Sequence, residues 1–565
     1  MASLTEQILS EDYHDFILPY NLPGVLEQFR DYGAQFLDSR YMLVHSRSSY
    51  PPFIAPNVGE VFNTYPFIPK LFTTLSTVSL ENSGIIQVQT QPNLNLSGKG
   101  MLIGFLDTGI DYTHPAFLDA SGRTRIAGIW DQTIQDGAET NPFHYGTFYT
   151  EEQINEALRS PDPKSVVPST DTDGHGTFLA GAAAGTPDPE SDFTGVAYDA
   201  RICMVKLKPA KQYLLDYYFA SRDAVVFQEN DLMMALNYLM LQADQLQLPL
   251  TICIGLGTNQ GDHAGNSPLS GMISYLSYIS YTIFAVAGGN EGGRGHHYYH
   301  MLENGNSDSV EILIPENTTG FVAELWGSGF SLLSVGFQSP IGTQIAPITS
   351  RPGKTETVSF ILEQTVITIS FSVVSESGGD PLIVFRFQNP TPGSWIIRVN
   401  NKIDNPASFH MWLPITGILE QDVRFLNPNP NTTLTVPANT EDAITTAAYN
   451  AENQSLYIHS GRGYARNGEI KPNLTSPGVN ITGPALGGGY HNQTGSSAAA
   501  AILAGSIALI QQWSMELPNP HPLNNLNMNS YLIRGATRDP GIEYPNREWG
   551  YGKLNVYNIF TTLIS

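Results

Sequence analysis

Three residues in separate parts of the chain have the types that move protons to and from a nucleophile. Asp107 ends an apolar run in Phe105-Leu-Asp-Thr-Gly, His175 lies between glycines in Asp173-Gly-His-Gly-Thr, and Ser497 begins an alanine-rich segment. If these side chains meet in space, the imidazole can take a proton from the hydroxyl while the carboxylate orients the ring. A hydroxyl activated in this way attacks acyl carbons, so the combination indicates acyl transfer or hydrolysis.

Each of these residues also has a structural explanation when it is taken alone. An Asp before Thr-Gly can shape a turn, a solitary His is more often structural, and a Ser at a helix start is ordinarily an N-cap. The helix start has a second property, because its free N–H groups and partial positive charge suit a developing oxyanion. Asn290, in Ala287-Gly-Gly-Asn, could cap a turn or donate its amide to that oxyanion.

The segments around these residues predict an α/β domain. Short, continuous apolar runs are typical of strands buried on both faces, as in a parallel sheet covered by helices. Asp107 and Asn290 follow two such runs, and open α/β sheets place ligands at the carboxyl ends of their strands. Residues 231–247 carry an apolar stripe at helical spacing and predict a helix. The four apolar runs are 101–106, 202–207, 250–256 and 283–287.

The pattern of apolar runs and turn residues also changes along the chain. Residues 306–432 contain short β-rich runs between Gly, Pro and Asn clusters, which favours an antiparallel sandwich or jelly roll. The α/β pattern returns afterwards, so we expect an all-β domain inserted into one α/β domain. The N-terminal part predicts a small α/β domain that ends in a polar linker. The expected boundaries are 1–95, 96–305, 306–432 and 433–565.

Composition excludes several functional classes. The chain has 565 residues, with 28 Lys and Arg against 52 Asp and Glu, and a net charge of −24. This balance is far too acidic for a protein that binds nucleic acid or an anionic membrane. No run approaches the roughly 18 apolar residues of a membrane span, and the acidic N-terminus shows no conventional export signal, so the compartment stays open. Cys203 and Cys253 lie in apolar runs without metal-ligand spacing, and we expect reduced core residues.

The order of these residues along the chain matches a known family. Asp107, His175 and Ser497 follow the order Asp-His-Ser of subtilisin, with Asn290 between His and Ser. The sequence resembles the subtilisin-like serine proteases, or subtilases, from about Gly98 to its end, apart from the β-rich insertion. It is most similar to the Csp germination proteases of clostridia and their relatives in anaerobic Firmicutes. That likeness rests on residues 98–112, 129–133, 256–261 and 544–554.

The resemblance implies a fold and a set of roles. The fold would be α/β, a subtilisin-like three-layer arrangement with a mainly parallel sheet, preceded by a small α/β prodomain and interrupted by an all-β jelly roll. The function would be that of a serine endopeptidase, with catalytic Asp107, His175 and Ser497 and with Asn290 in the oxyanion hole. A protein or peptide substrate would extend along two segments by main-chain hydrogen bonds. These segments are Gly255, Leu256 and Gly257, and Ala287, Gly288 and Gly289.

No prosthetic group is implied, and we expect a monomer without a metal site. Asp188, Glu190 and Asp192 could bind calcium, as in many subtilases, but they lack EF-hand spacing and a solvated turn is favoured. Two positions depart from the family pattern. Ser496 replaces the usual Thr and opens a second register for the nucleophile, although the small residues that follow match only when Ser497 is used. Gly255 replaces the usual Ser of the substrate-lining strand, so relatives do not predict substrate preference.

The resemblance further implies that the prodomain is an intramolecular chaperone, cleaved by the enzyme itself and retained in the cleft. Cleavage would fall in the polar segment of Gln87, Gln89, Gln91, Asn93 and Asn95. One alternative stays open, a catalytically silent subtilase-like scaffold or sensor whose cleft is blocked by its prodomain. A lipase or esterase of the α/β-hydrolase type is excluded, because no Gly-x-Ser-x-Gly elbow lies at a suitable strand end and the order of the triad differs.

Overall fold

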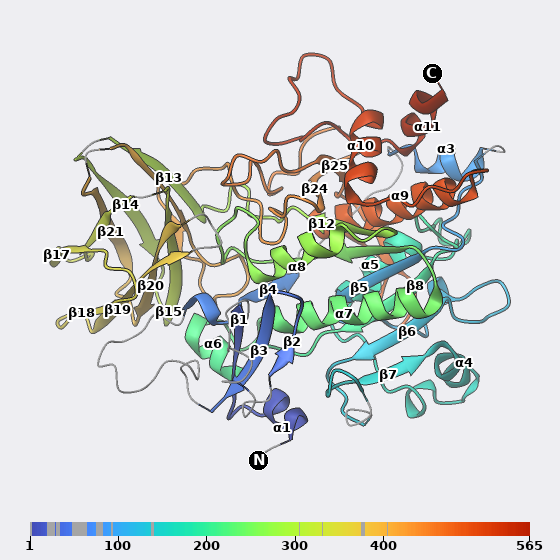
Figure 1. Ribbon diagram of the computed structural model, residues 1–565, viewed down its shortest axis with the longest axis horizontal. Helices are drawn as coiled ribbons and strands as arrows, with labels where there is room; N and C mark the ends of the chain where they lie inside the picture. The colour runs from blue at the N-terminus through green and yellow to red at the C-terminus, as the bar shows by residue number, and fades with distance from the viewer. Residues whose placement is uncertain are drawn as a thin grey trace.

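The central element of the molecule is an eight-stranded sheet (Figure 1). The computed structural model describes residues 3–19, 29, 34–47, 65–74, 83–91, 94–136, 141–303, 305–329, 331–374, 379–403 and 405–564. Neighbouring strands of the sheet are parallel, except for one antiparallel pair at its edge, β6 and β7. In spatial order the strands are β25 (Leu474–Pro477), β24 (Ile444–Tyr449), β12 (Thr282–Ala287), β10 (Leu250–Ile254), β5 (Leu102–Asp107), β8 (Arg201–Lys206), β6 (Ile126–Asp131) and β7 (Thr147–Thr150).

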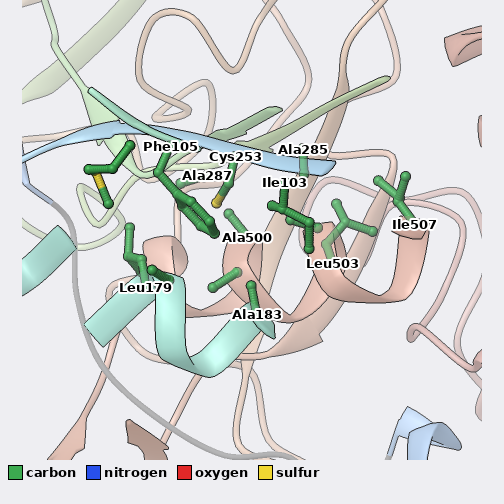
Figure 2. Packing of buried hydrophobic residues seen from close by; sticks show 14 of the residues in the cluster. Ile103, Phe105, Leu179, Ala183, Cys253, Ala285, Ala287, Ala500, Leu503 and Ile507 are labelled. Atoms are coloured by element: carbon green, nitrogen blue, oxygen red, sulfur yellow. The ribbon is translucent and has the colours of Figure 1, made fainter. Parts of the chain in front are cut away.

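Helices cover both faces of this sheet and make three layers. On one face, α5 (His175–Ala184) and α9 (Ser496–Glu516) pack against Ile103 and Phe105 of β5 (Figure 2). On the other face, α7 (Glu229–Leu246) and α8 (Pro268–Ser277) pack against the alternate residues of the same strands. Because successive side chains of a strand point to opposite faces, each apolar run supplies both cores. The predicted buried strands and the helix at 231–247 are confirmed.

One described helix, α9, is long and apolar enough to cross a membrane by length and composition alone. However, 89% of its most apolar window is buried inside the fold. Its alanines and leucines contact the central sheet and α5. We therefore interpret α9 as the core helix of the α/β domain.

An antiparallel β-sandwich is inserted between β12 and β24, and it lies at the left of Figure 1. The two sheets enclose a separate apolar core in which Trp395 is fully buried. Its first strand begins at His297, before the expected boundary at 306. The six-stranded sheet contains β13 (His297–Leu302), β22 (Ala407–Trp412), β15 (Gly320–Gly327), β20 (Asp380–Gln388), β19 (Thr365–Val374) and β18 (Thr355–Phe360). The five-stranded sheet contains β17 (Gln344–Thr349), β16 (Leu333–Gln338), β21 (Gly393–Asn401), β14 (Ser307–Ile314) and β23 (Arg424–Phe425).

The N-terminal part of the chain forms a small antiparallel sheet and then crosses the α/β domain. The sheet has the order β1 (His14–Pro19), β3 (Tyr41–Ser46) and β2 (Gln35–Phe36), is preceded by α1 (Leu4–Leu9), and shares the apolar core of α7. Further along, β4 (Leu71–Thr74) joins a three-stranded sheet between β11 (Leu256–Gly257) and β9 (Val226–Gln228). The remaining helices and strands are α3 (Ile85–Thr90), α4 (Glu151–Arg159), α6 (Gln212–Tyr218), α10 (Asn525–Gly535), α11 (Val556–Ile564), β26 (Ile481–Pro484) and β27 (Tyr490–Gln493), with 3₁₀ turns η2 (Tyr65–Phe67), η4 (Pro115–Phe117) and η6 (Pro163–Ser165).

A buried ionic network fastens the N-terminal sheet to the α/β domain. Asp15 of β1 accepts hydrogen bonds from His45 Nδ1 at 2.6 Å, Lys211 Nζ at 3.0 Å and Gln228 Nε2 at 2.7 Å. Burial alone would raise the pKa of this carboxyl, but the charges of Lys211 and His45 outweigh burial and hold the pKa well below its ordinary value. A lowered pKa means that the ionised form stabilises the packed state.

We predict that Asp15→Asn loosens the N-terminal sheet, because it leaves the ammonium of Lys211 buried without its carboxylate. We expect the free energy that holds the N-terminal sheet on the α/β domain to fall by about 3 to 5 kcal/mol. In the unchanged chain, the ionised carboxylate of Asp15 should stabilise this packing fully above its ordinary pKa of 3.8. The stabilisation should be lost progressively as the pH falls from 3.8 toward the lower pKa of the folded state. Hydrogen exchange of residues 14–46 measures both effects. Asp12→Asn at an exposed position is the matched control, and equal exchange in the two variants would contradict the prediction.

Candidate active site

The three side chains singled out in the sequence meet in one hydrogen-bonded chain. His175 Nδ1 lies 2.8 Å from Asp107 Oδ1, and His175 Nε2 lies 3.1 Å from Ser497 Oγ. Asp107 stands at the end of β5, His175 at the start of α5 and Ser497 in the first turn of α9. All three are buried. This geometry allows the imidazole to take a proton from the serine while the carboxylate holds the opposite ring nitrogen.

The electrostatics of His175 favour its charged form. Burial alone would lower the pKa of the imidazole, but the negative charge of Asp107 and its hydrogen bond outweigh burial, so the pKa of His175 is raised. Asp107 Oδ1 also accepts a hydrogen bond from Thr108 N at 2.8 Å, which fixes the carboxylate. The site can therefore stabilise an imidazolium during a reaction.

Local sequence explains why α5 begins at His175. Asp171 accepts hydrogen bonds from Gly174 N at 2.9 Å and from Thr177 N at 3.0 Å, which satisfies free donors at the start of the helix. Gly176 packs directly on the turn after β5, where an added Cβ would lie 2.2 Å from Gly109 O. A larger residue would push the helix away from β5. The glycines around His175 thus bring its ring within reach of Asp107.

The structure separates the roles of the two adjacent serines. Ser497 Oγ faces the imidazole, whereas Ser496 Oγ accepts a hydrogen bond from Gly289 N at 3.0 Å. Ser496 N donates to Asn290 Oδ1 at 3.0 Å. Ser496 thus joins the start of α9 to the end of β12. Of the two registers considered from the sequence, the geometry favours Ser497 as the nucleophile.

The side chain of Asn290 is fixed by a hydrogen bond to the start of α9. Because Oδ1 accepts from Ser496 N, the amide plane is fixed and Nδ2 is the group that can donate to a ligand. Nδ2 has no hydrogen-bond partner among the residues that the structure describes. The backbone N–H of Ser497, in the first turn of α9, is a second donor at this end of the helix.

A segment of the chain's own N-terminal part, β4, lies between β9 and β11 next to Ser497, and the space that it fills is called the groove here. In β4, Thr73 pairs with Gly257 and Thr74 pairs with Leu256, both antiparallel. Gly255 directly precedes this pair, and a Cβ added there would lie 3.1 Å from Ser497 Cβ. The strand therefore runs toward Gly255 and Ser497. Leu256 and Gly257 thus pair with an extended segment of this chain, and their pairing with a substrate stays a prediction.

The opposite side of the groove is formed by β9, which the sequence analysis missed. Leu71 pairs with Gln228, Phe72 with Phe227 and Thr73 with Val226. The only signal for this strand is the run Val225-Val-Phe, which is short and leads directly into α7. A three-residue strand of this kind forms only when a partner lies on it, so its own sequence does not reveal it.

The second predicted substrate segment has a different set of partners. Gly288 N donates to Thr446 O at 2.9 Å, and Gly289 N donates to Ser496 Oγ. Ala287 is the last residue of β12 and is buried in the core. Ala287, Gly288 and Gly289 do not pair with β4. They connect the central sheet to the start of α9.

The predicted self-cleavage segment lies away from this groove. Gln87 and Gln89 are in α3, and Gln89 Nε2 donates to Val196 O at 2.7 Å. Gln91 is the C-cap of α3, Asn95 follows it in a left-handed conformation, and Asn93 lies outside the described residues. A helix anchored by its own side chain cannot also be an extended strand in the cleft.

The residues that follow this segment give the position of α3 relative to Ser497. Ser97 N and Gly98 N donate to Gln512 Oε1 at 2.9 and 2.7 Å. Gln512 lies on α9 about four turns beyond Ser497, or roughly 22 Å. The polar stretch thus runs along the far end of α9, and the structure corrects the expectation that it threads the cleft.

The described residues show no arrangement suited to a metal ion, since no group of three or more His, Cys, Asp or Glu comes together there. Asp188 accepts hydrogen bonds from Glu190 N at 3.1 Å and Ser191 Oγ at 2.9 Å, which makes a local turn. Cys203 and Cys253 are buried and unpaired by disulfide, and burial raises the pKa of the Cys203 thiol to about 12.

Comparisons with known proteins agree with this geometry. A family model described as the Subtilase family matches residues 98–354 and 370–552. Among solved structures, the chain is similar to the CspB protease of Clostridium perfringens, with 32% identity and a TM-score of 0.77 over 86% of this chain and 97% of that one. Among curated proteins, it is similar to the C5a peptidase of Streptococcus pyogenes, with 22% identity over 493 residues that cover 83% of this chain and 41% of that protein. The chain thus spans about two fifths of that relative.

We predict that Asp107→Asn lowers the pKa of His175, because it removes the charge that opposes the effect of burial. The fall is expected because burial, which lowers the pKa of the imidazole, is then no longer opposed by the charge of Asp107. NMR titration of the imidazole measures it directly. Asp119→Asn, at an exposed position, is the control and should leave the titration unchanged. An unshifted His175 in Asp107→Asn would show that the carboxylate does not set its charge.

Proposed function

The chain belongs to the subtilase family and is a subtilisin-like serine protease, and on this premise we propose that Asp107, His175 and Ser497 are its catalytic triad. The observation that carries the proposal is the continuous hydrogen-bonded chain from Asp107 Oδ1 through His175 to Ser497 Oγ. These three side chains lie beside an extended peptide segment, β4, which pairs with β11 as a bound substrate would. The activity proposed is hydrolysis of internal peptide bonds.

In the proposed reaction, Ser497 Oγ attacks the carbonyl carbon of the scissile bond and His175 Nε2 takes its proton. Asp107 keeps the imidazole in the correct tautomer and stabilises the imidazolium. His175 then gives the proton to the leaving amine, and an acyl-enzyme forms on Ser497. Water attacks the acyl group with the same base, and the free serine returns. The raised pKa of His175 supports this role as an acceptor of the proton.

Asn290 is proposed to stabilise the tetrahedral oxyanion together with the backbone N–H of Ser497. Its Oδ1 is already engaged by Ser496 N, so Nδ2 is presented without rearrangement. Donors held in place before the reaction cost no reorganisation when charge develops. Ser496 supports this arrangement by joining β12 to α9.

Peptides are proposed to bind as a strand between β9 and β11, as β4 does. Main-chain pairing on both sides gives affinity without regard to most side chains. The N-terminal part of the chain is then the first substrate. Because β4 runs toward Gly255 and Ser497, we place self-cleavage between Thr74 and Ser83 rather than in residues 87–95. The α3 segment would stay with the catalytic domain, held by Gln89.

A second candidate function has one observation in its favour, the occupation of the cleft by β4. A chain whose N-terminal part never leaves would act as a scaffold or sensor. A fluorophosphonate probe separates the two, since it labels an activated serine with an accessible cleft. Labelling of the wild-type chain that is lost in Ser497→Ala supports the protease. If the wild-type chain is never labelled or cleaved, the result supports the scaffold or sensor and contradicts the protease.

We predict that the wild-type chain splits after Thr74, whereas Ser497→Ala remains one chain because it lacks the nucleophile. Intact mass and N-terminal sequencing should give a large fragment that begins between residues 75 and 83. Ser506→Ala is the matched control, since this buried serine on the same helix only donates to Ile502 O. A new N-terminus within 88–96 would contradict the proposed position, and an uncut wild-type chain would contradict self-processing.

We predict that Asn290→Ala lowers kcat by about a hundred- to a thousandfold with little change in KM, because the lost amide acts on the transition state. This magnitude is the one known for the oxyanion asparagine of subtilisin. Asn290→Asp keeps an acceptor for Ser496 N but replaces the donor with a negative charge, so it should lower kcat at least as much. Kinetics on a peptide substrate after active-site titration test both. An unchanged kcat in Asn290→Ala would remove Asn290 from the mechanism.

A further inference from the structure

The segment that leads into the cleft crosses a junction between the α/β domain and the inserted sandwich. Tyr65 and Lys70 lie against Glu324 of β15, in the sandwich, and against the start of α7, in the α/β domain. A cavity of about 100 Å³ adjoins Tyr65, Lys70 and Glu324. Lys70 is 7% exposed, although it carries an ammonium group. A buried lysine needs a compensating negative environment.

Two buried carboxylates act on the ammonium of Lys70 through space, without a direct ion pair among the described contacts. Glu229, the first residue of α7, is 1% exposed and accepts hydrogen bonds from Lys70 N at 3.4 Å and Leu269 N at 3.1 Å. Glu324 is 2% exposed and accepts from Gly261 N at 2.9 Å and Trp326 Nε1 at 2.7 Å. These bonds hold both carboxylates in fixed positions.

The ammonium of Lys70 contacts the backbone and the ring of Tyr65. Nζ donates to Tyr65 O at 3.0 Å and lies 3.7 Å from the centre of the Tyr65 ring. Tyr65 in turn donates its hydroxyl to Glu324. Burial lowers the pKa of Lys70, and the charges of Glu324 and Glu229 oppose that effect. Lys70 is also the charge that opposes the effect of burial on both carboxylates, whose own pKa values are raised.

The place of Lys70 along the bound strand is defined by the pairing of β4. Lys70 directly precedes β4, and Thr74, four residues further on, pairs with Leu256 next to the nucleophile. Leu71 N donates to Gln260 Oε1 at 3.2 Å, which fixes the backbone between these points. Any peptide that pairs with β11 in the same register puts its equivalent residue beside the two carboxylates.

We propose that Glu229 and Glu324 form a subsite for a lysine or arginine four positions before the residue that pairs with Leu256. Lys70 fills this subsite in the chain itself, and a protein substrate with a basic residue at that position fills it after the N-terminal segment leaves. The inference rests on the proposed protease function. It also gives the inserted sandwich a part in substrate choice, since Glu324 comes from β15. A neutral residue would leave two carboxylates buried without a cation, which is unfavourable.

The first test uses self-cleavage of the full chain. Lys70→Met keeps most of the side-chain length but removes the charge, and it should slow cleavage after Thr74 by about tenfold or more. Lys70→Arg should stay within about threefold of the wild-type rate. Lys164→Met, at an exposed lysine, is the matched control. Equal rates for Lys70→Met and Lys70→Arg would overturn the subsite.

The second test uses quenched fluorescent peptides with the sequence of residues 66–82 and Lys, Arg, norleucine or Glu at the position of Lys70. Self-processed wild-type enzyme should prefer Lys and Arg over norleucine by about tenfold or more in kcat/KM, mainly through KM, and should disfavour Glu most. Glu324→Gln and Glu229→Gln should each reduce this preference. Because the peptide series is read on the wild-type enzyme, a variant that fails to fold does not decide the result.

The outcomes distinguish this inference from the function on which it rests. An enzyme that is labelled by fluorophosphonate and cleaves all four peptides equally overturns the subsite but leaves the protease in place. A chain that neither reacts with the probe nor cleaves itself overturns both. If the N-terminal segment stays in the cleft and excludes the peptides, the self-cleavage rates of the Lys70 variants decide.

Discussion

The close packing of α5 against α9 determines the distance between His175 and Ser497. Both helices lie on the same face of the central sheet, where small residues such as Ala183 and Ala500 separate them (Figure 2). A Cβ added at Gly505 would lie 2.7 Å from Ala183 O, so larger side chains here would force the helices apart. Because each helix begins at the edge of the sheet where β5 ends, this packing also brings both side chains to Asp107. The chemistry of the site therefore depends on a helix contact that touches no reacting atom.

The cleft is built from two short strands whose edges need a partner. β9 and β11 both pair with β4, which satisfies main-chain groups that would otherwise face solvent. The apolar residues of β4 join the two cores of the α/β domain, which ties the N-terminal part to its stability. Main-chain pairing discriminates little between sequences, whereas two buried carboxylates discriminate by charge. The inserted sandwich contributes one of these carboxylates and thus reaches the cleft from outside the catalytic domain.

Local sequence was sufficient to predict those strands and helices whose formation depends mainly on the burial of their apolar residues. The continuous apolar runs predicted strands buried on both faces, and the spacing in residues 231–247 predicted α7. The alternation of short runs and turn residues predicted the strands of the sandwich. The polar stretch at 87–95 was expected to thread the cleft and does not, because polarity and nearness to the catalytic domain do not show which segment forms a strand. Residues 85–90 form a helix anchored by Gln89, and the strand in the groove lies earlier in the chain.

The sequence by itself determined the residue types of the candidate site, since the short motifs around Asp107, His175, Ser497 and Asn290 are recognisable in combination and by their order along the chain. It also determined which segments are buried. Only the tertiary structure decided that Ser496 joins β12 to α9 while Ser497 faces the imidazole, and that Thr73 and Thr74 lie opposite Gly257 and Leu256. The physical reason is that pairing register and helix contacts join residues far apart in the chain. No local pattern encodes such partners, because each partner's position follows from the packing of everything between them.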